Sequence, residues 1–232
     1  MSLEPAAEPE RLYLAVGADI NAHRPLFTGD IFSDVEISGV GPSTAIVIGH
    51  PCSIRGKNGR LAERMPVAAV KTHAPVPPDR WCNGYFSMMP LAGLPAEGDF
   101  HVAHLDLFGL ALTSELSAAE RLACLSQPGI NQLQQRLVFH QTRLEVPPGK
   151  FQQAFDHTYE EAELMEDWTT ALSVVDDCPE SSFESWIREG SPDRQSRLKI
   201  REERASIRRE LRKEINNRLD QHPCEQESVE SQ

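Results

Sequence analysis

Short apolar runs separated by turn-forming residues fill the first half of the chain. Between about residues 11 and 113 the turns are marked by Gly, Pro, Asn and Asp, and the runs are LYLAVGADI, GDIFSDVEI, TAIVIGHP, VAAVKTH, YFSMMPL and VAHLDLFGLAL. Such punctuation is typical of β-strands. In the second run Ile31, Val35 and Ile37 occupy positions of a period-two pattern, which predicts a half-buried strand, whereas residues 45–48 are apolar on both faces and predict a central strand. Several short strands within about 100 residues predict a small closed or nearly closed barrel.

Helical periodicity follows in the next third of the chain. Residues 117–120 (SAAE) have the form of a capping box, which predicts a helix through AERLACLSQ that ends at residues 128–129 (Pro-Gly). Apolar residues at helical spacing predict a second helix over 130–137 and a longer amphipathic helix over 151–172 with an acidic outer face. We expect these last two helices to pack on the barrel.

The C-terminal third predicts a short helix and then a long one. A second capping box at residues 181–184 begins the short helix, and Gly190 ends it. Ser191 as N-cap and Pro192 in the first turn begin a helix that runs to about Leu219. Its apolar stripe is one residue wide, which is too narrow for a globular core and suits a coiled coil or a groove. We therefore expect this stripe to bind a partner through Ile207, Leu211, Ile215 and Leu219.

Together these patterns predict an α+β fold with five segments. A β-barrel domain with packed helices covers residues 11–175, a linker with the short helix covers 176–190, and a charged helical arm covers 191–219. The two ends, residues 1–10 and 220–232, are rich in small and polar residues and are predicted to be disordered.

Charge constrains the partner. The formal net charge of -12 disfavours a protein that coats nucleic acid, because binding to phosphates requires concentrated Lys and Arg. The charge is uneven, however: residues 156–187 contain ten acidic side chains and no Lys or Arg, while residues 188–220 contain eleven basic side chains and seven acidic ones. We expect a protein partner or self-association through the C-terminal helix. The alternatives are that the basic arm folds back on the acidic stretch, or that it binds nucleic acid.

The sequence also bears on compartment and redox state. It has no apolar run of about 18 residues, and its first residues are acidic and contain Pro5 and Pro9, so we expect a cytoplasmic protein without a membrane segment. The odd number of cysteines without CxxC spacing predicts reduced thiols. These cysteines are Cys52, Cys82, Cys124, Cys178 and Cys224.

One candidate catalytic group lies where an apolar strand meets a proline. His50 and Cys52 flank Pro51 and lie two residues apart, so their β-carbons would be about 7 Å apart in an extended chain. A thiol nucleophile needs a base within hydrogen-bond reach, and His73 or His101 from another strand would serve Cys52 better than His50. The competing interpretation is a buried structural cysteine.

Histidine and cysteine also suggest a zinc site in the barrel half. Because these residues lack paired ligand knuckles, we expect no bound metal and no cofactor. The residues with suitable ligand atoms are His50, Cys52, His73, Cys82, His101 and His104.

Two further surfaces could bind a ligand. Asn83-Gly84 lies between aromatic residues, which predicts a hairpin and, as an alternative, a base-stacking surface. In QLQQRLVFHQTRL, the side chains of Arg136, His140 and Arg143 could meet a phosphate or a partner carboxylate, although solvated helix faces have the same composition. The sequence contains no P-loop, dinucleotide fingerprint, GxSxG or HExxH motif.

GDIF, AIVIGHP and VAAVKTH, taken in this order over residues 28–113, resemble the opening of the SH3-like barrel of the MazF/PemK ribonuclease toxins. The resemblance implies that Gly29 and Asp30 enter the first strand and that Thr72 holds the position of the active-site hydroxyl. That family has an arginine just before the second strand, where this chain has Ser43-Thr44. Stabilising a scissile phosphate would then require another cation, for which the candidates are Arg55, Lys57 and Lys71.

We therefore expect an SH3-like barrel with packed helices and a long charged C-terminal helix. The expected function is a non-catalytic binding or adaptor subunit of a bacterial-type complex of the toxin-antitoxin or antiviral defence kind. The alternatives are a MazF-like endoribonuclease and a thiol- or zinc-dependent enzyme around His50 and Cys52. The candidate catalytic residues are Thr72, Cys52, His50 and His73.

Overall fold

The computed structural model describes residues 3–56, 60–98, 100–191 and 195–221. The fold is mixed α+β, and the described chain divides into two compact units. The first unit consists of residues 3–22, 26–56 and 60–159, and the second consists of residues 23–25 and the chain from 160 onward. The boundary lies inside the long helix α5 (Pro148–Leu172).

The first unit contains a seven-stranded sheet in which every neighbouring pair is antiparallel. The strand order is β1-β7-β2-β3-β4-β6-β5. The apolar run predicted to be a central strand does lie there, because residues 45–47 belong to β3. The strands are β1 (Tyr13–Val16), β2 (Asp30–Ile37), β3 (Gly41–Val47), β4 (Arg64–Thr72), β5 (Met88–Leu91), β6 (His101–Leu112) and β7 (Arg121–Leu125).

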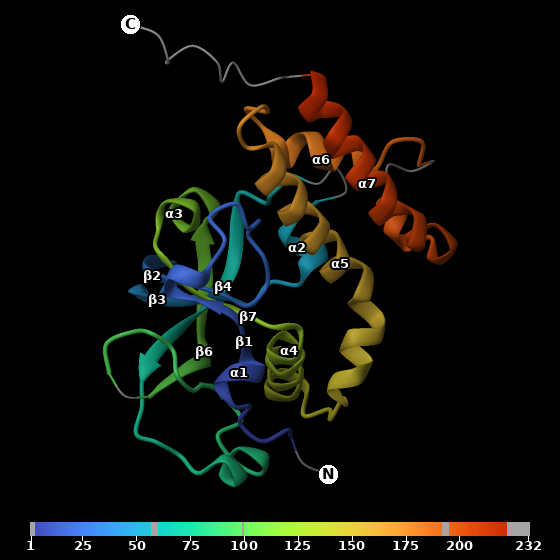
Figure 1. Cartoon of the computed structure of the whole chain (residues 1–232). Coiled ribbons are helices and arrows are strands. Elements are labelled where there is room, and N and C mark those ends of the chain that lie inside the picture. Colours follow the sequence, from blue (N-terminus) through green and yellow to red (C-terminus); the bar gives the residue numbers. More distant parts are fainter. Residues whose placement is uncertain (1–2, 57–59, 99, 192–194, 222–232) are drawn as a thin grey trace, which may run out of the picture. The chain divides into compact units, whose positions relative to one another are not determined.

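The sheet is open, and the prediction of a closed barrel is wrong (Figure 1). It does curl, because the Ser38 amide after β2 donates to the Leu110 carbonyl of β6 at 3.0 Å. A closed barrel would require β6 to pair along the edge of β2 that faces away from β3. Strand β7 instead pairs with the first residues of that edge. β1 and β5 remain as the two edge strands.

Strand β2 follows the predicted period-two pattern, with one irregularity. Ile31, Val35 and Ile37 are buried and Glu36 is exposed. The register against β3 shifts between Phe32 and Val35, where Asp34 takes a left-handed backbone angle (φ 48°). The shift allows Phe32 to be buried as well. The core beneath the sheet includes Leu26, Phe32, Val35, Ile37, Val47, Ile54, Met65, Val67 and Leu116.

The helix predicted from the capping box at residues 117–120 is wrong. A short helix, α3 (Thr113–Ala118), ends there, and the next residues form strand β7. Helix propensity is a weak signal, and here β1 and β2 provide pairing edges on both sides of the segment. Residues 128–129 do not end a helix but lie in the first turn of α4 (Gln127–Thr142). Proline is tolerated there because the first-turn amides have no partner within the helix.

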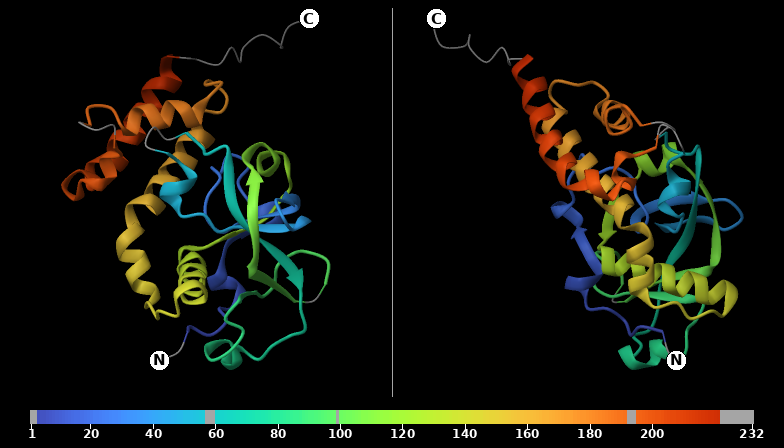
Figure 2. Two further views of the ribbon diagram at one scale, coloured as in Figure 1. Left: turned by 180° about the vertical axis from the view of Figure 1, so that it is seen from behind. Right: turned by 90° about the vertical axis from the view of Figure 1, so that its right-hand side faces the viewer.

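Helix α4 carries part of the candidate site. Ser126 caps its start by accepting from the Gly129 amide at 3.1 Å, and Arg143 ends it in a left-handed conformation (φ 61°). The short helix α1 (Pro9–Leu12) lies beside α4 (Figures 1 and 2). A β-carbon at Gly129 would meet the Leu12 carbonyl oxygen at 2.3 Å, so this approach requires glycine. The remaining short elements of this unit are η1 (Gly17–Asp19), α2 (Pro51–Ile54) and η2 (Pro78–Cys82).

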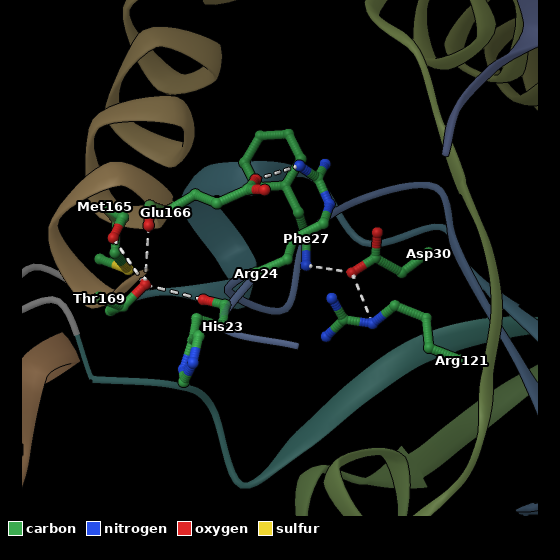
Figure 3. Close-up of polar contacts among 8 residues, drawn as sticks. All are labelled: His23, Arg24, Phe27, Asp30, Arg121, Met165, Glu166 and Thr169. Carbon is green, nitrogen blue, oxygen red and sulfur yellow. Dashed lines mark hydrogen bonds and ion pairs between the residues drawn. The ribbon is translucent and has the colours of Figure 1, made fainter. Parts of the chain in front are cut away.

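The second unit is helical and has an aromatic core. Besides the end of α5 it contains α6 (Pro179–Ile187), η3 (Arg197–Lys199) and α7 (Arg201–Gln221). Trp168 stacks on Trp186 with ring centroids 5.3 Å apart. The segment at residues 23–25 joins this unit through an ion pair of 2.8 Å between Arg24 and Glu166 (Figure 3). α6 begins at Pro179, two residues before the predicted capping box.

The apolar stripe of α7 is buried inside the second unit. Ile207, Leu211 and Ile215 are 0%, 3% and 9% exposed and pack with Trp168, Phe183 and Trp186, while Leu219 packs against the same cluster. This packing covers the stripe within the second unit, so the predicted partner contact through these four residues has no support from the structure. The broad tryptophan rings cover a stripe that is only one residue wide. The predicted helix start at residues 191–192 is wrong, because Ser191 is in coil and the helix begins at Arg201; residue 192 itself lies outside the described residues.

Complementary charge accompanies this packing. Arg208 on α7 donates to Glu160 and Glu163 on α5 at 3.1 and 2.9 Å. Arg218 lies over the Trp168 ring at 4.6 Å. The basic arm thus folds on the acidic stretch, which was the alternative to a partner.

The N-terminal end of the described chain differs from the prediction of disorder. Residues 1–10 were predicted to be disordered, but Leu3 is 2% exposed and its segment is hydrogen-bonded to α4. Residues 222–232 of the predicted tail lie outside the described residues. Over the part of the chain that is described, none of the helices combines the length and the apolar character needed to span a bilayer.

Candidate functional site

The candidate catalytic residues fall into two groups at opposite ends of β4. Thr72 is the last residue of β4 and His73 follows it. His50 lies near the other end, because the amides of residues 48 and 49 donate to the Pro66 carbonyl at 3.0 and 3.3 Å. His73 is the seventh residue after Pro66, and seven residues of extended chain span about 23 Å.

The predicted thiol–base pair depends on which histidines lie near Cys52. His101 pairs with Thr72 in the sheet, so it lies at the same end of β4 as His73. A base must be within hydrogen-bond reach of the nucleophile, so the pair between Cys52 and either histidine stays a prediction. The side chain of Cys52 itself lies outside the described part of the structure.

The His50 end has a second histidine. His50 is half-buried, and burial together with nearby His157 lowers the pKa of its imidazole. Among the described side chains, no three His, Cys, Asp or Glu residues are grouped so that they could hold a metal ion. Among the described side chains, this end therefore offers a histidine pair.

The other end of β4 carries an aromatic cluster, formed by His73, Trp81, Tyr85 and Phe100. The fully buried Trp81 ring lies 4.9 Å from Tyr85 and stacks on Phe100 at 6.3 Å. The His73 ring meets Tyr85 edge-on at 5.9 Å, and the His73 amide donates to the Phe100 carbonyl at 2.9 Å. Three neighbouring segments of the chain, within residues 73–100, thus meet in one cluster.

Tyr85 is the exposed member of this cluster. Its side chain is 41% exposed, and its backbone is left-handed (φ 54°), which is unfavourable for a residue with a β-carbon. The hairpin predicted at Asn83-Gly84 is wrong, because η2 precedes it and β5 pairs with β6. Strained backbone of this kind persists where the surroundings hold it and is concentrated at functional sites.

The hydrogen bond of His73 determines its neutral tautomer. Its Nδ1 lies 2.6 Å from the Ala74 carbonyl, which can only accept, so Nδ1 carries the proton and Nε2 is the acceptor. Thr72 precedes it in extended chain, so the two side chains point to opposite faces. A β-carbon on Gly98 would lie 2.6 Å from the methyl carbon of Thr72, so this methyl group packs closely against Gly98. Thr72 and His73 therefore do not form a nucleophile–base pair.

Arg136 lies beneath the cluster and is fully buried. Its guanidinium donates to the carbonyls of Trp81, Glu4 and Met88 at 3.0, 3.1 and 3.3 Å and lies 5.4 Å from the Trp81 ring centroid. Burial lowers the pKa of Arg136 to about 10, against a small opposing effect of the Cys82 thiol. Because its guanidinium is buried and donates to these carbonyls, Arg136 does not lie on an exposed helix face where it could meet a phosphate from solvent. Arg136 instead holds three chain segments together.

The other two predicted helix-face residues lie further along α4. His140 is half-buried, whereas Arg143 is exposed. The Arg143 guanidinium lies over the rings of Phe86 and Phe139 at 6.0 and 5.6 Å. Phe86 follows Tyr85 in the chain, so the Arg143 guanidinium lies beside the segment that carries Tyr85.

The described residues implied by the MazF/PemK resemblance lie at different places in the first unit. Asp30 is fully buried, accepts from the Phe27 amide at 2.9 Å and lies 3.7 Å from the Arg121 guanidinium (Figure 3), so it stabilises the entry to β2. Lys71 is exposed beside Thr72, whereas Arg55 follows α2 at the His50 end. Lys57 lies outside the described residues, and Gly29 has a positive φ of 85°.

Comparison with known proteins gives no further assignment, since neither a family model nor a curated protein matches this chain. Sequence reasoning identified the aromatic residues around Asn83 but missed Phe100 and the burial of Arg136. The missed signal for Arg136 was the group of three glutamines just before it, because several amides within about one turn of a helix suit a polar interior contact.

Proposed function

We propose that the chain is a non-catalytic binding module that recognises its partner through the exposed side of the aromatic cluster, with Tyr85 at the centre. The observation that carries this proposal is Tyr85 itself, an exposed aromatic side chain on left-handed backbone against a fully buried tryptophan. Exposed tyrosines on rigid supports dominate many interfaces, because they bury a large area at little entropic cost.

The support beneath Tyr85 is consistent with a preorganised surface. Arg136 fixes the Trp81 carbonyl and faces the Trp81 ring, and Phe100 stacks on that ring. A surface that is rigid before binding loses less entropy on association and therefore binds more tightly.

A catalytic role has less support. Thr72 and His73 point to opposite faces, and the side chain of Cys52 lies outside the described part of the structure. Of the candidate cations, Arg55 lies at the opposite end of β4 from Thr72, and exposed Lys71, the neighbour of Thr72 in the strand, points to the other face. We therefore prefer an adaptor subunit of a bacterial-type complex, of the toxin-antitoxin or antiviral defence kind that the resemblance implies, to a nuclease.

The test compares two exposed aromatic residues of the same unit. Tyr85→Ala removes the proposed contact, while Phe108→Ala removes a 52% exposed ring from β6 and serves as the matched control. The tagged full chain and both variants are used to retain partners from a lysate of the source organism, and thermal melting verifies their folding. We expect retention to fall about tenfold or more in Tyr85→Ala alone, since an interface hot spot contributes about 2 kcal/mol or more. Equal retention by both variants would contradict the proposal.

A further inference from the structure

The first described residues of the chain lie against a polar groove on α4. Three side chains of this helix, Gln132, Gln135 and Arg136, are buried and form what we name the α4 groove. Residues 3–5 occupy it and are named the N-terminal strap. Buried glutamine is uncommon unless its amide is hydrogen-bonded, so the groove is a specifically polar site.

The groove binds the strap through main-chain atoms. The Glu4 amide donates to Gln135 Oε1 at 2.9 Å, and Arg136 donates to the Glu4 carbonyl at 3.1 Å. Gln132 donates to the Pro5 carbonyl, and the Leu3 amide donates to the Cys82 carbonyl at 3.2 Å. Gln135 also donates to the Val146 carbonyl at 3.2 Å, so both ends of its amide are used.

Only one strap side chain is enclosed. Leu3 is 2% exposed, whereas the side chains of Glu4 and Pro5 face solvent. The groove thus recognises an extended main chain and one leucine-sized side chain. Proteins that bind extended peptides use the same combination, with main-chain hydrogen bonds for affinity and a pocket for specificity.

One acceptor in the groove is unused by the strap. The buried Oε1 of Gln132 has no hydrogen-bond partner among the described residues. A buried polar atom without a partner costs free energy, and an amide of another peptide in the groove would satisfy it. The strap is also linked to α1 by Ala6 and Ala7, which are in coil and therefore allow it to leave the groove without disturbing a helix.

We propose that the α4 groove is a docking site for an extended peptide segment of a partner protein, which places a leucine-sized side chain in the Leu3 site. The chain's own strap is the resident occupant that the partner displaces. Because the strap is tethered by a short linker, it competes at an effective concentration of about millimolar. A weak ligand therefore cannot displace the strap, whereas a segment that makes additional contacts can. This proposal is independent of the role of Tyr85.

The experiment uses the full chain and a fluorescent synthetic peptide with the sequence of residues 1–7. The variant Leu3→Asp weakens the chain's own strap, and peptide binding to this variant and to the wild type is measured by fluorescence anisotropy. We expect the variant to bind the peptide at least fivefold more tightly than the wild type. A peptide with Asp in place of its leucine should not bind. Adding Gln135→Ala to the variant should weaken binding about tenfold, while Gln141→Ala, an exposed glutamine of the same helix, should leave it unchanged.

A folded Leu3→Asp variant that does not bind the peptide, or binding that is insensitive to Gln135→Ala, would overturn the proposal. If Leu3→Asp does not fold, the wild type is studied instead by hydrogen exchange of the Glu4 amide in millimolar peptide. Faster exchange supports displacement of the strap, and unchanged exchange overturns it. A wild-type dimer at high protein concentration that is lost in Gln135→Ala would overturn docking of a different protein and assign the groove to strap exchange between copies.

Discussion

Replacing Arg136 with methionine should destabilise the first unit and loosen three of its segments together. Methionine has a similar length and no charge, so the change removes the guanidinium while largely filling its space. The carbonyls of Glu4, Trp81 and Met88 then lose their donor in a buried environment.

The magnitude follows from two opposing contributions. Each hydrogen bond from a charged donor is worth about 1.5 kcal/mol or more, and the contact with the Trp81 ring adds about 1 kcal/mol. Against this, burial lowers the pKa of Arg136 to about 10, so that removing the charge recovers about 3 kcal/mol. The carbonyls left without a donor add their own desolvation cost of at least about 1 kcal/mol. The expected net loss in the free energy of unfolding is about 3 kcal/mol.

Urea unfolding followed by hydrogen exchange and mass spectrometry separates this effect by segment. Peptides that contain residues 3–8 and 79–89 should lose protection at lower urea, whereas peptides from α7 should not change. The matched control is Arg143→Met, which removes an exposed arginine at the C-terminal cap of the same helix and should cost about 1 kcal/mol, because its contacts with the Phe86 and Phe139 rings are exposed. Equal effects of the two substitutions would refute the assignment of Arg136 as a buried clamp.

Three further predictions concern other parts of the chain. The protein should not cleave single-stranded RNA in a manner that depends on Thr72, and cleavage by the wild type that disappears in Thr72→Ala would restore the ribonuclease alternative. Because the pKa of His50 is lowered in the folded state, the unfolded chain takes up the proton first, and stability should fall as pH drops below about 6.5. His50→Gln should reduce the decrease in melting temperature between pH 7.5 and 5.5, and an unchanged decrease would show that burial beside His157 has no such effect. Ile207→Ala should cost about 3 kcal/mol in the second unit, and half-exposed Ile200→Ala less than about 1 kcal/mol, as measured by urea unfolding; similar values would contradict the buried stripe.

The strands were predictable because their signal is local. Alternation in residues 31–37 and the doubly apolar run at 45–48 each report the faces of a single strand, and both lie where expected. The closure of the sheet is not local. It depends on β7, whose sequence has a helical start signal and which becomes a strand because β1 and β2 pair with it.

Burial of polar and charged residues was the other limit of the sequence. Arg136 was expected on a polar helix face that meets a ligand or solvent, and its burial follows from carbonyls in three other segments. The stripe of α7 was judged too narrow for a core, but the stacked rings of Trp168 and Trp186 supply the missing width. Both cases require tertiary contacts that no helical period contains.

The central claim is that Tyr85 touches a partner, and photo-crosslinking at that position tests it most directly. The full chain with p-benzoylphenylalanine in place of Tyr85 is irradiated in cells of the source organism, and the same replacement of Phe108 is the control. We predict a discrete crosslinked partner from position 85 that is absent or much weaker from position 108. No crosslink at position 85, or the same products from both positions, would contradict the account.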